Sequence, residues 1–172
     1  MSNVITRPGP VAPDVFRRAV SKFTTGITVV TAVDDDGVCG MTCNSFTSVS
    51  LSPATILVSL RPGRTHAAIA RGRRFGVSIL RREQQSCSDY FSGAARAGGR
   101  PNDIVTRHAA PTLNASLAWF ECEVIDDVWV NDHTLFVARV EACGADSGDP
   151  LLFFDSGYHH HALSPVQRLP MQ

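Results

Sequence analysis

Residues 40–53 read GMTCNSFTSVSLSP, and this uncharged stretch decides how the rest of the chain is interpreted. Seven of its fourteen residues carry a side-chain hydroxyl or amide: Thr42, Asn44, Ser45, Thr47, Ser48, Ser50 and Ser52. Two strongly apolar runs, residues 27–33 and 54–60, lie on either side of it. Small neutral donors and acceptors between two predicted strands indicate either a polar binding loop or a connector built from serine and threonine turns.

A binding loop of this composition suits one kind of ligand. Short hydroxyl and amide side chains pair well with many carbonyl, hydroxyl and ring-nitrogen positions, such as those of an isoalloxazine ring with its ribityl chain. Small residues also let backbone N–H groups approach a phosphate closely. Composition alone leaves the connector as an open alternative.

Outward from this stretch, the pattern predicts a mainly β fold. Short runs rich in β-branched residues predict strands over 27–33, 38–42, 54–60, 75–80, 115–125, 134–142 and 151–155. Helices are expected over 15–22, 65–71 and 83–91, with Asp14 and Thr65 as N-caps. Residues 92–112, rich in Gly, Ala, Arg and Pro, are expected to form a mobile loop. Short turns between most strands favour an antiparallel β-barrel with short helices.

Length and composition favour one folded domain. The chain has 172 residues and a formal net charge of zero, which argues against a protein held on nucleic acid by bulk electrostatics. We expect a flexible arm over 1–13, a domain over 14–162 and a weakly structured tail over 163–172. No apolar run is long enough to span a bilayer. The first residues do not resemble a signal peptide.

The five cysteines point to a cytoplasmic protein. They are Cys39, Cys43, Cys87, Cys122 and Cys143, an odd number with no C-x-x-C pair. Neither a disulfide framework nor a structural zinc site is expected from that spacing, so we interpret them as reduced, mostly buried thiols.

Three further features carry candidate chemistry, each with an ordinary structural alternative. In RPGRTHAAIA, Arg61 and Arg64 precede a helix start, which is either an anion site or a normal helix beginning with solvated arginines. Asn131-Asp132-His133 is either a turn that presents a working His or a turn alone. The run 159–161 is three histidines, but successive strand residues alternate faces, so a metal site there is not expected.

Several common enzyme motifs are absent from the sequence. There is no G-x-G-x-x-G after a strand, no G-x-x-x-x-G-K-[ST], no G-x-S-x-G and no H-E-x-x-H. A Rossmann domain, a P-loop and an α/β-hydrolase are therefore disfavoured.

Taken in order, five segments resemble the short-chain flavin reductase family, the reductase components of two-component flavin monooxygenases. They are FRRAVSKFTTGITVVTA, GMTCNSFTSVSLSP, FGVSIL with EQQSCSDYFSG, NDHTLFVARV, and PLLFFDSGYH. The match covers about residues 14–162. The resemblance implies a six-stranded antiparallel split barrel that forms a homodimer, with flavin near the subunit interface.

The resemblance also implies a set of site residues. It places a flavin ring at the central motif, flavin phosphates at RPGRT, and NADH near His133. The implied flavin and NADH contacts are Thr42, Cys43, Asn44, Ser45, Ser48, Ser59, Arg61, Thr65, Ser78, Ile79, Leu80, Gln84, Ser88, Phe91, His133 and Tyr158. Three positions depart from the family's habit: Thr24 replaces Pro, Ser78 replaces Asn, and Asn131 replaces Gly.

The implied activity is hydride transfer from NADH to FAD, or to FMN, with diffusible reduced flavin passed to a separate monooxygenase. No metal is needed, and the cofactors carry the chemistry. Two alternatives remain open at this point. One is a tightly flavin-bound electron-transfer protein on the same fold without an NADH site, and the other is a non-catalytic small-ligand binding barrel.

Overall fold

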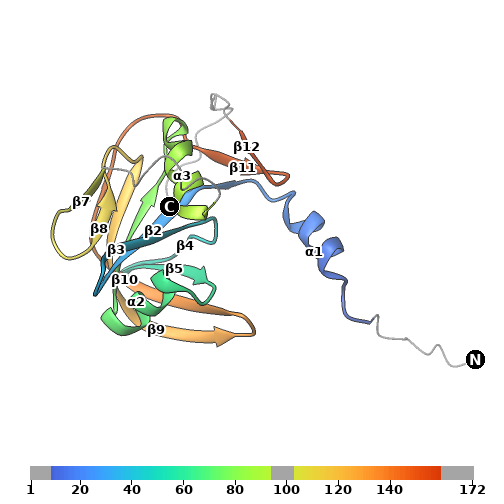
Figure 1. The fold of residues 1–172 in the computed structure, drawn as a ribbon, viewed down its shortest axis with the longest axis horizontal. Coiled ribbons are helices and arrows are strands. Elements are labelled where there is room, and N and C mark those ends of the chain that lie inside the picture. The colour runs from blue at the N-terminus through green and yellow to red at the C-terminus, as the bar shows by residue number, and fades with distance from the viewer. Residues whose placement is uncertain (1–8, 94–102, 160–172) are drawn as a thin grey trace, which may run out of the picture.

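The computed structural model describes residues 9–93 and 103–159, and its centre is an antiparallel sheet (Figure 1). In the described residues this sheet has seven strands in the order β3-β2-β6-β9-β10-β5-β4. The strands are β2 (Thr28–Asp34), β3 (Gly37–Cys43), β4 (Thr47–Leu51), β5 (Ala54–Leu60), β6 (Arg74–Ile79), β9 (Ala118–Val130) and β10 (His133–Ala145). The mainly β, antiparallel prediction is confirmed, with one strand more in the sheet than the six expected.

The sheet curls so that its two outer strands come together. Strands β3 and β4 stand at opposite ends of the strand order, yet only residues 44–46 join them. So short a link spans at most about 14 Å, so the two ends of the sheet must lie close to each other. No ladder closes the gap between β3 and β4 in the described sheet, which is what a split barrel requires. We call this opening, formed by residues 43–47 and Ser59, the seam.

Strand β4 was not expected. Residues 47–51 alternate serine or threonine with apolar residues and were interpreted as part of a loop, but they pair with β5 from Thr47↔Leu57 to Leu51↔Ala54. The strand is at the sheet edge and largely exposed, with Leu51 83% exposed. Because an exposed edge strand buries no apolar face, it lacks the pattern that identified the other strands.

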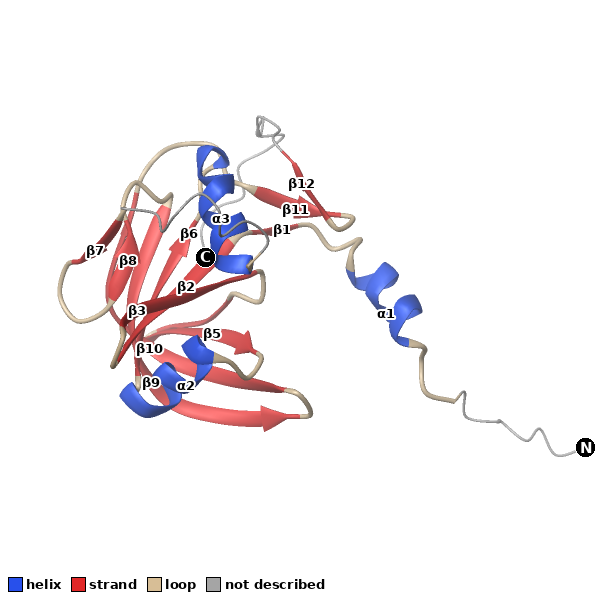
Figure 2. Cartoon of the chain, viewed as in Figure 1, coloured by secondary structure: helices blue, strands red, loops and turns tan. Residues whose placement is uncertain are grey.

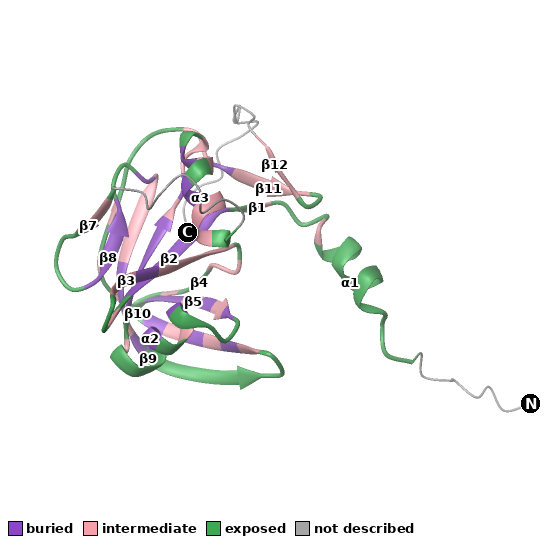
Figure 3. Cartoon of the chain, viewed as in Figure 1, coloured by how far each residue is buried: buried purple, intermediate pink, exposed green. Residues whose placement is uncertain are grey.

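The described residues form three α-helices, of which α2 (Arg64–Gly72) and α3 (Gln85–Ser92) pack against the sheet and α1 (Pro13–Val20) lies away from it (Figure 2); α3 is preceded by the 3-10 turn η1 (Arg82–Gln84). The expected helices are confirmed, but both expected N-caps are wrong. Helix α1 starts at Pro13, whose fixed φ and missing N–H suit a first turn, and α2 follows an extended Gly63. Helix α1 projects from the barrel and is exposed along its length (Figure 3).

Two small sheets complete the described fold. Strand β1 (Thr25–Gly26) pairs with β11 (Leu152–Phe154), which pairs with β12 (Gly157–His159). Strand β7 (Ile104–Thr106) pairs with β8 (Pro111–Leu113). Part of the expected mobile loop over 92–112 is therefore a hairpin, whereas residues 94–102 lie outside the described residues. Neither the arm over 1–8 nor the tail from residue 160 is described, so those two boundaries stay predictions.

A single buried carboxylate explains why residues 107–110 are ordered. Glu121 on β9 is 1% exposed and accepts the backbone N–H groups of His108, Ala109 and Ala110, at 3.1, 2.6 and 3.2 Å. Burial alone would raise the pKa of Glu121, but these three hydrogen bonds hold it below its ordinary value.

The core is split by strand β2 into two clusters. Val30, Val58 and Phe136 belong to the cluster inside the barrel, and Val29 and Leu80 belong to the cluster beneath α3. Successive residues of a strand face opposite sides, so both faces of β2 are buried. This explains why residues 27–33 read as one continuous apolar run. The two clusters thus pack on opposite faces of β2, the strand that pairs with β3 at one side of the seam.

Candidate functional site

A cleft of about 600 Å³ opens at the seam. Among the predicted residues it brings together Asn44, Ser45, Ser59 and Ile79. The other residues that line it are Val20, Phe23, Thr25, Gly26, Thr28, Phe46, Thr47 and Leu57. This wall contains no ionisable side chain, so the seam cleft combines neutral donors and acceptors with aliphatic and aromatic surface. Such a lining suits a flat, polar-edged ring.

The Ser45 hydroxyl takes the place of a strand at the seam. Its Oγ donates to the Ser59 carbonyl at 2.8 Å and accepts the Ser59 N–H at 3.0 Å. The last β4–β5 pair on this side is Thr47↔Leu57, so Ser59 is one step beyond the ladder. On the opposite edge, Thr28 Oγ1 donates to the Cys43 carbonyl at 2.8 Å. The short side chains of Ser45 and Thr28 thus satisfy backbone groups on the two sides of the seam.

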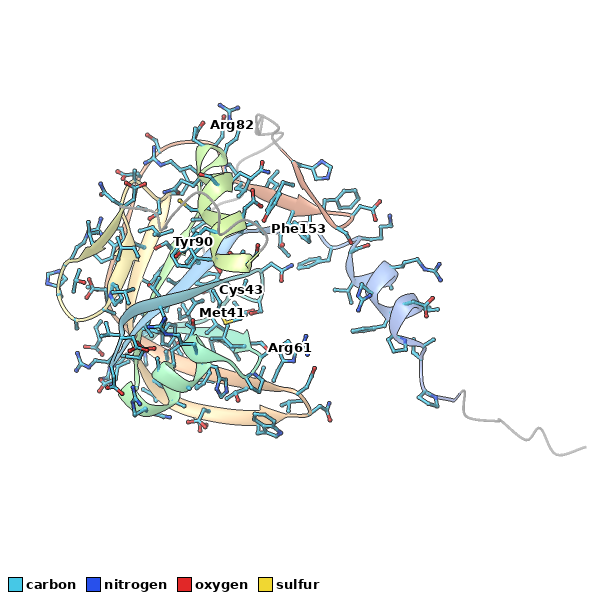
Figure 4. All side chains as sticks on the ribbon, viewed as in Figure 1. Met41, Cys43, Arg61, Arg82, Tyr90 and Phe153 are labelled. Atoms are coloured by element: carbon cyan, nitrogen blue, oxygen red, sulfur yellow. The ribbon has the colours of Figure 1, made fainter. Side chains whose placement is uncertain are left out.

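A second hollow of about 330 Å³ runs along the free edge of β3 and includes Thr65 and Phe91. Arg64 also lines it and forms a two-pronged ion pair with Asp34, at 2.5 and 2.7 Å. That bond lowers the pKa of Asp34 to about 2. Gly40 is needed at this edge, because a Cβ there would lie 2.8 Å from the Phe91 ring. Figure 4 shows Met41 and Cys43 of β3 between Tyr90 of α3 and Arg61 beyond β5.

Three predicted residues form a hydrogen-bonded chain. Thr42 Oγ1 donates to the Ser88 carbonyl at 2.7 Å, and Ser88 Oγ lies 2.7 Å from the Tyr158 hydroxyl. Burial raises the pKa of Tyr158 above its ordinary value. Strand β3, helix α3 and strand β12 are therefore held together behind the central motif.

Arg61 and His133 meet at the mouth of the barrel. The β9–β10 turn places Asn131 at φ 52°, in the left-handed region, a conformation that asparagine tolerates. His133 Nδ1 lies 2.8 Å from one Asp132 oxygen, and Arg61 Nε lies 3.8 Å from the other. The bond to His133 lowers the pKa of Asp132. Because Nδ1 is engaged by Asp132, a ligand would be contacted through Nε2.

The fold described above agrees with the comparisons to known proteins. A family model described as "Flavin reductase like domain" matches residues 20–162. This chain belongs to the flavin reductase-like family. It is 50% identical over 152 residues to the NADH-dependent flavin reductase StyB of Pseudomonas fluorescens, covering 86% of this chain and 89% of that one.

Solved structures of flavin reductases resemble this family member closely. The styrene monooxygenase flavin reductase SMOB from Pseudomonas putida S12 superimposes with a TM-score of 0.81 at 49% identity, covering 87% of this chain and 99% of that chain. The NADH:FAD oxidoreductase SgcE6 of Streptomyces globisporus C-1027 gives a TM-score of 0.79 at 29% identity, covering 92% and 100%. The split-barrel expectation is therefore confirmed.

Within this flavin reductase-like fold, three predicted contacts have side chains engaged in the barrel itself. Ser78 is fully buried, and its Oγ accepts the Leu113 N–H at 2.8 Å. Leu80 is fully buried beneath α3. Gln84 donates to the Asn114 carbonyl at 3.0 Å and accepts the backbone N–H that follows Leu80 at 3.1 Å. Ser48 is exposed on β4 and is not among the residues that line the seam cleft.

The sequence did not single out several residues that line the seam cleft. Val20, in the predicted first helix, and Phe23, just after it, form one wall. Thr25 also lines the cleft, and its Oγ1 is buried with no hydrogen-bond partner. The structure supplies the signal that marks this wall as a contact surface: apolar side chains at and just after the first helix that the rest of the chain does not cover, with Phe23 75% exposed.

The described residues contain neither a cluster of metal-binding side chains nor a membrane-spanning helix. No group of three His, Cys, Asp or Glu side chains is arranged to hold a metal ion within residues 9–93 and 103–159. His159 belongs to β12, but His160 and His161 are outside those ranges, so the histidine run itself is not tested. None of the helices in the described part of the chain is long and apolar enough to cross a membrane.

Proposed function

We propose that this chain is an NADH-dependent flavin reductase of the EC 1.5.1 type, which reduces FAD, or FMN, and releases the reduced flavin to a separate monooxygenase. The observation that carries the proposal is the uncharged seam cleft between the two open sheet edges, with the Asp132–His133 pair at the mouth of the same barrel. The relatives support it, since StyB is named an NADH-dependent flavin reductase and SMOB is the flavin reductase of a styrene monooxygenase.

The residues of the seam fit a flavin. Asn44 is exposed at the cleft, and Thr25 contributes a hydroxyl that has no partner among the described residues. We propose that Thr42, Cys43, Asn44, Ser45 and Ser59 hold the ring and the ribityl chain, with Ile79 against the ring. When bound, the flavin supplies the hydride-accepting centre.

We assign phosphate binding to the far end of the groove. Arg61 precedes the nine-residue helix α2, and Arg64 and Thr65 are its first two residues. Orphan N–H groups at a helix start and nearby guanidinium groups attract phosphate. Phe91 and Tyr158 then close the groove from the α3 side. FAD is our proposed preference, because the second hollow along β3, which Arg64 and Thr65 line, offers room beyond a single phosphate.

His133 is proposed to position NADH. With Nδ1 bound to Asp132, its Nε2 is available to a nicotinamide carboxamide. Substitution His133→Ala is expected to raise the KM for NADH several-fold and to leave flavin affinity within twofold. An unchanged KM for NADH would remove His133 from the site.

The deciding experiment is an NADH oxidation assay with FAD, FMN and riboflavin in turn, repeated with NADPH. Colourless protein that oxidises NADH only when flavin is added supports the reductase. Lasting yellow colour without NADH oxidation would support the alternative, a tightly flavin-bound electron carrier. Absence of any flavin binding would overturn both and leave the non-catalytic binding barrel.

We also propose a cytoplasmic homodimer. Val15, Phe16, Val20 and Phe23 on and just after α1 are 47 to 75% exposed, an apolar face that one chain leaves uncovered. All five cysteines are free, in keeping with a reducing compartment. Light scattering after gel filtration should give about twice the chain mass of 18.6 kDa, and Phe16→Glu should lower it toward one chain mass.

A further inference from the structure

The ring of His66 joins helix α2 to the start of strand β10. Its Nε2 lies 2.8 Å from Thr134 Oγ1. The ring centre lies 5.2 Å from that of Phe136 and 6.4 Å from that of Trp129, at steep angles to both. Thr134 is 5% exposed and Phe136 is 1% exposed. His66 therefore fills the space between α2 and the turn end of the β9–β10 hairpin.

The Thr134 hydroxyl is well placed to control His133. Successive residues on a strand point to opposite faces, so Thr134 faces the barrel interior and His133 faces the other side. His133 is the first residue of β10 and follows a tight turn, where strand ends fray most easily. Fixing Thr134 fixes the rotation of the strand end, and with it the direction in which His133 leaves the strand.

The same ring also connects the two ends of the proposed groove. His66 follows Thr65 directly on α2, and Thr134 pairs with Leu60, the residue before Arg61. A shift of α2 is therefore transmitted to the strand end that carries His133 through one hydrogen bond.

We infer that His66 is a positioning residue for NADH, acting through Thr134 on His133. The inference rests on the proposed function, because it assumes that His133 contacts NADH. His66 itself touches neither flavin nor nicotinamide in this arrangement, and its contacts are with Thr134, Phe136 and Trp129.

The test compares variants that separate the hydrogen bond from the packing. His66→Phe keeps a ring against Phe136 and Trp129 but removes the bond, and Thr134→Val removes it from the other side at nearly constant volume. His66→Gln keeps a polar atom near the Nε2 position and serves as the rescue variant. The matched control is Thr55→Val, a threonine 6% exposed near the far end of the adjacent strand β5.

The expected result is a rise in the KM for NADH of about three- to tenfold in His66→Phe and in Thr134→Val, the range that one ordinary hydrogen bond supports. The double variant should show the same rise, since both changes remove one bond. In these variants the kcat and the KM for flavin should stay within about twofold of wild type. In His66→Gln the KM for NADH should also stay within about twofold of wild type. Thr55→Val should leave the KM for NADH unchanged.

Three outcomes would overturn the inference. A lower melting temperature with an unchanged KM for NADH would make His66 purely structural, while a raised KM in His133→Ala would keep the proposed function intact. Additive effects in the double variant would show that the bond is not the shared cause. No effect of His133→Ala on the KM for NADH would remove the assigned role of His133 and the inference together.

Discussion

The bond between Ser45 and Ser59 offers the sharpest test of how the seam is built. In Ser45→Ala, the Ser59 N–H and carbonyl each lose a partner, at present 3.0 and 2.8 Å away. A hydrogen bond contributes about 0.5–1.5 kcal/mol net, so the two together should lower the free energy of unfolding by about 1–3 kcal/mol. For a chain of this size that is a melting temperature lower by about 2–4 °C for each kcal/mol.

The same change should weaken flavin binding, since the two sheet edges lose their side-chain connection at the proposed ring site. We expect a dissociation constant for FAD raised about three- to tenfold, measured by quenching of flavin fluorescence, alongside thermal melts. The control for stability is Ser48→Ala on exposed β4, expected within about 0.5 kcal/mol of wild type. If Ser45→Ala melts like wild type and binds FAD equally well, the reasoning about the seam is refuted.

Three further predictions concern the scaffold. In Gly76→Ala the added Cβ would overlap the Pro111 carbonyl oxygen, so a loss of more than about 3 kcal/mol is expected by urea unfolding, with Gly72→Ala, which meets no neighbour, as the neutral control. Glu121 has a lowered pKa, so the stability it contributes is present above the ordinary glutamate pKa of about 4.3 and is lost as pH falls through the lower folded value. The difference in melting temperature between wild type and Glu121→Gln should therefore be large at pH 7 and smaller in acid. A difference that does not change with pH would contradict this. Tyr158→Phe should cost about 1 kcal/mol through loss of its bond to α3, measured by urea unfolding, and a neutral effect would show that this bond contributes nothing to stability.

The parts of the fold that the sequence predicted are those with strong local patterns. Both faces of β2 are buried, so residues 27–33 are mostly apolar, with Thr28 and Thr31 as the exceptions. The Asn131-Asp132 turn needs a left-handed residue, and asparagine tolerates that conformation. The three helices have an apolar spacing that can be recognised from the local sequence, without knowing what each helix packs against.

The parts that were missed depend on distant contacts or on exposure. The loop of the β7–β8 hairpin is held by Glu121, a residue 11 or more positions further along the chain, and no local pattern reveals such a bond. The loop-like reading of residues 47–51 failed because an exposed edge strand needs no apolar face. Only an observed hydrogen bond shows that Ser78 faces Leu113, since a serine suits a ligand site and a buried sheet equally well.

The site was predicted in composition more than in geometry. Asn44, Ser45 and Ser59 do meet at one cleft, because the β4–β5 register places Ser45 beside Ser59. The sequence could not show that the Ser45 hydroxyl is hydrogen-bonded to the backbone of Ser59, or that Val20 and Phe23 form the facing wall.

The open seam between β3 and β4 has a consequence for how a ligand enters and leaves the protein. A fully closed barrel would have to break main-chain bonds before a large flat guest could escape. Here the edges of β3 and β4 share no such bonds, and a three-residue tether with one serine hydroxyl spans them. Flavin can then enter and leave by movement of side chains alone, which suits an enzyme that must release its reduced flavin after every turnover.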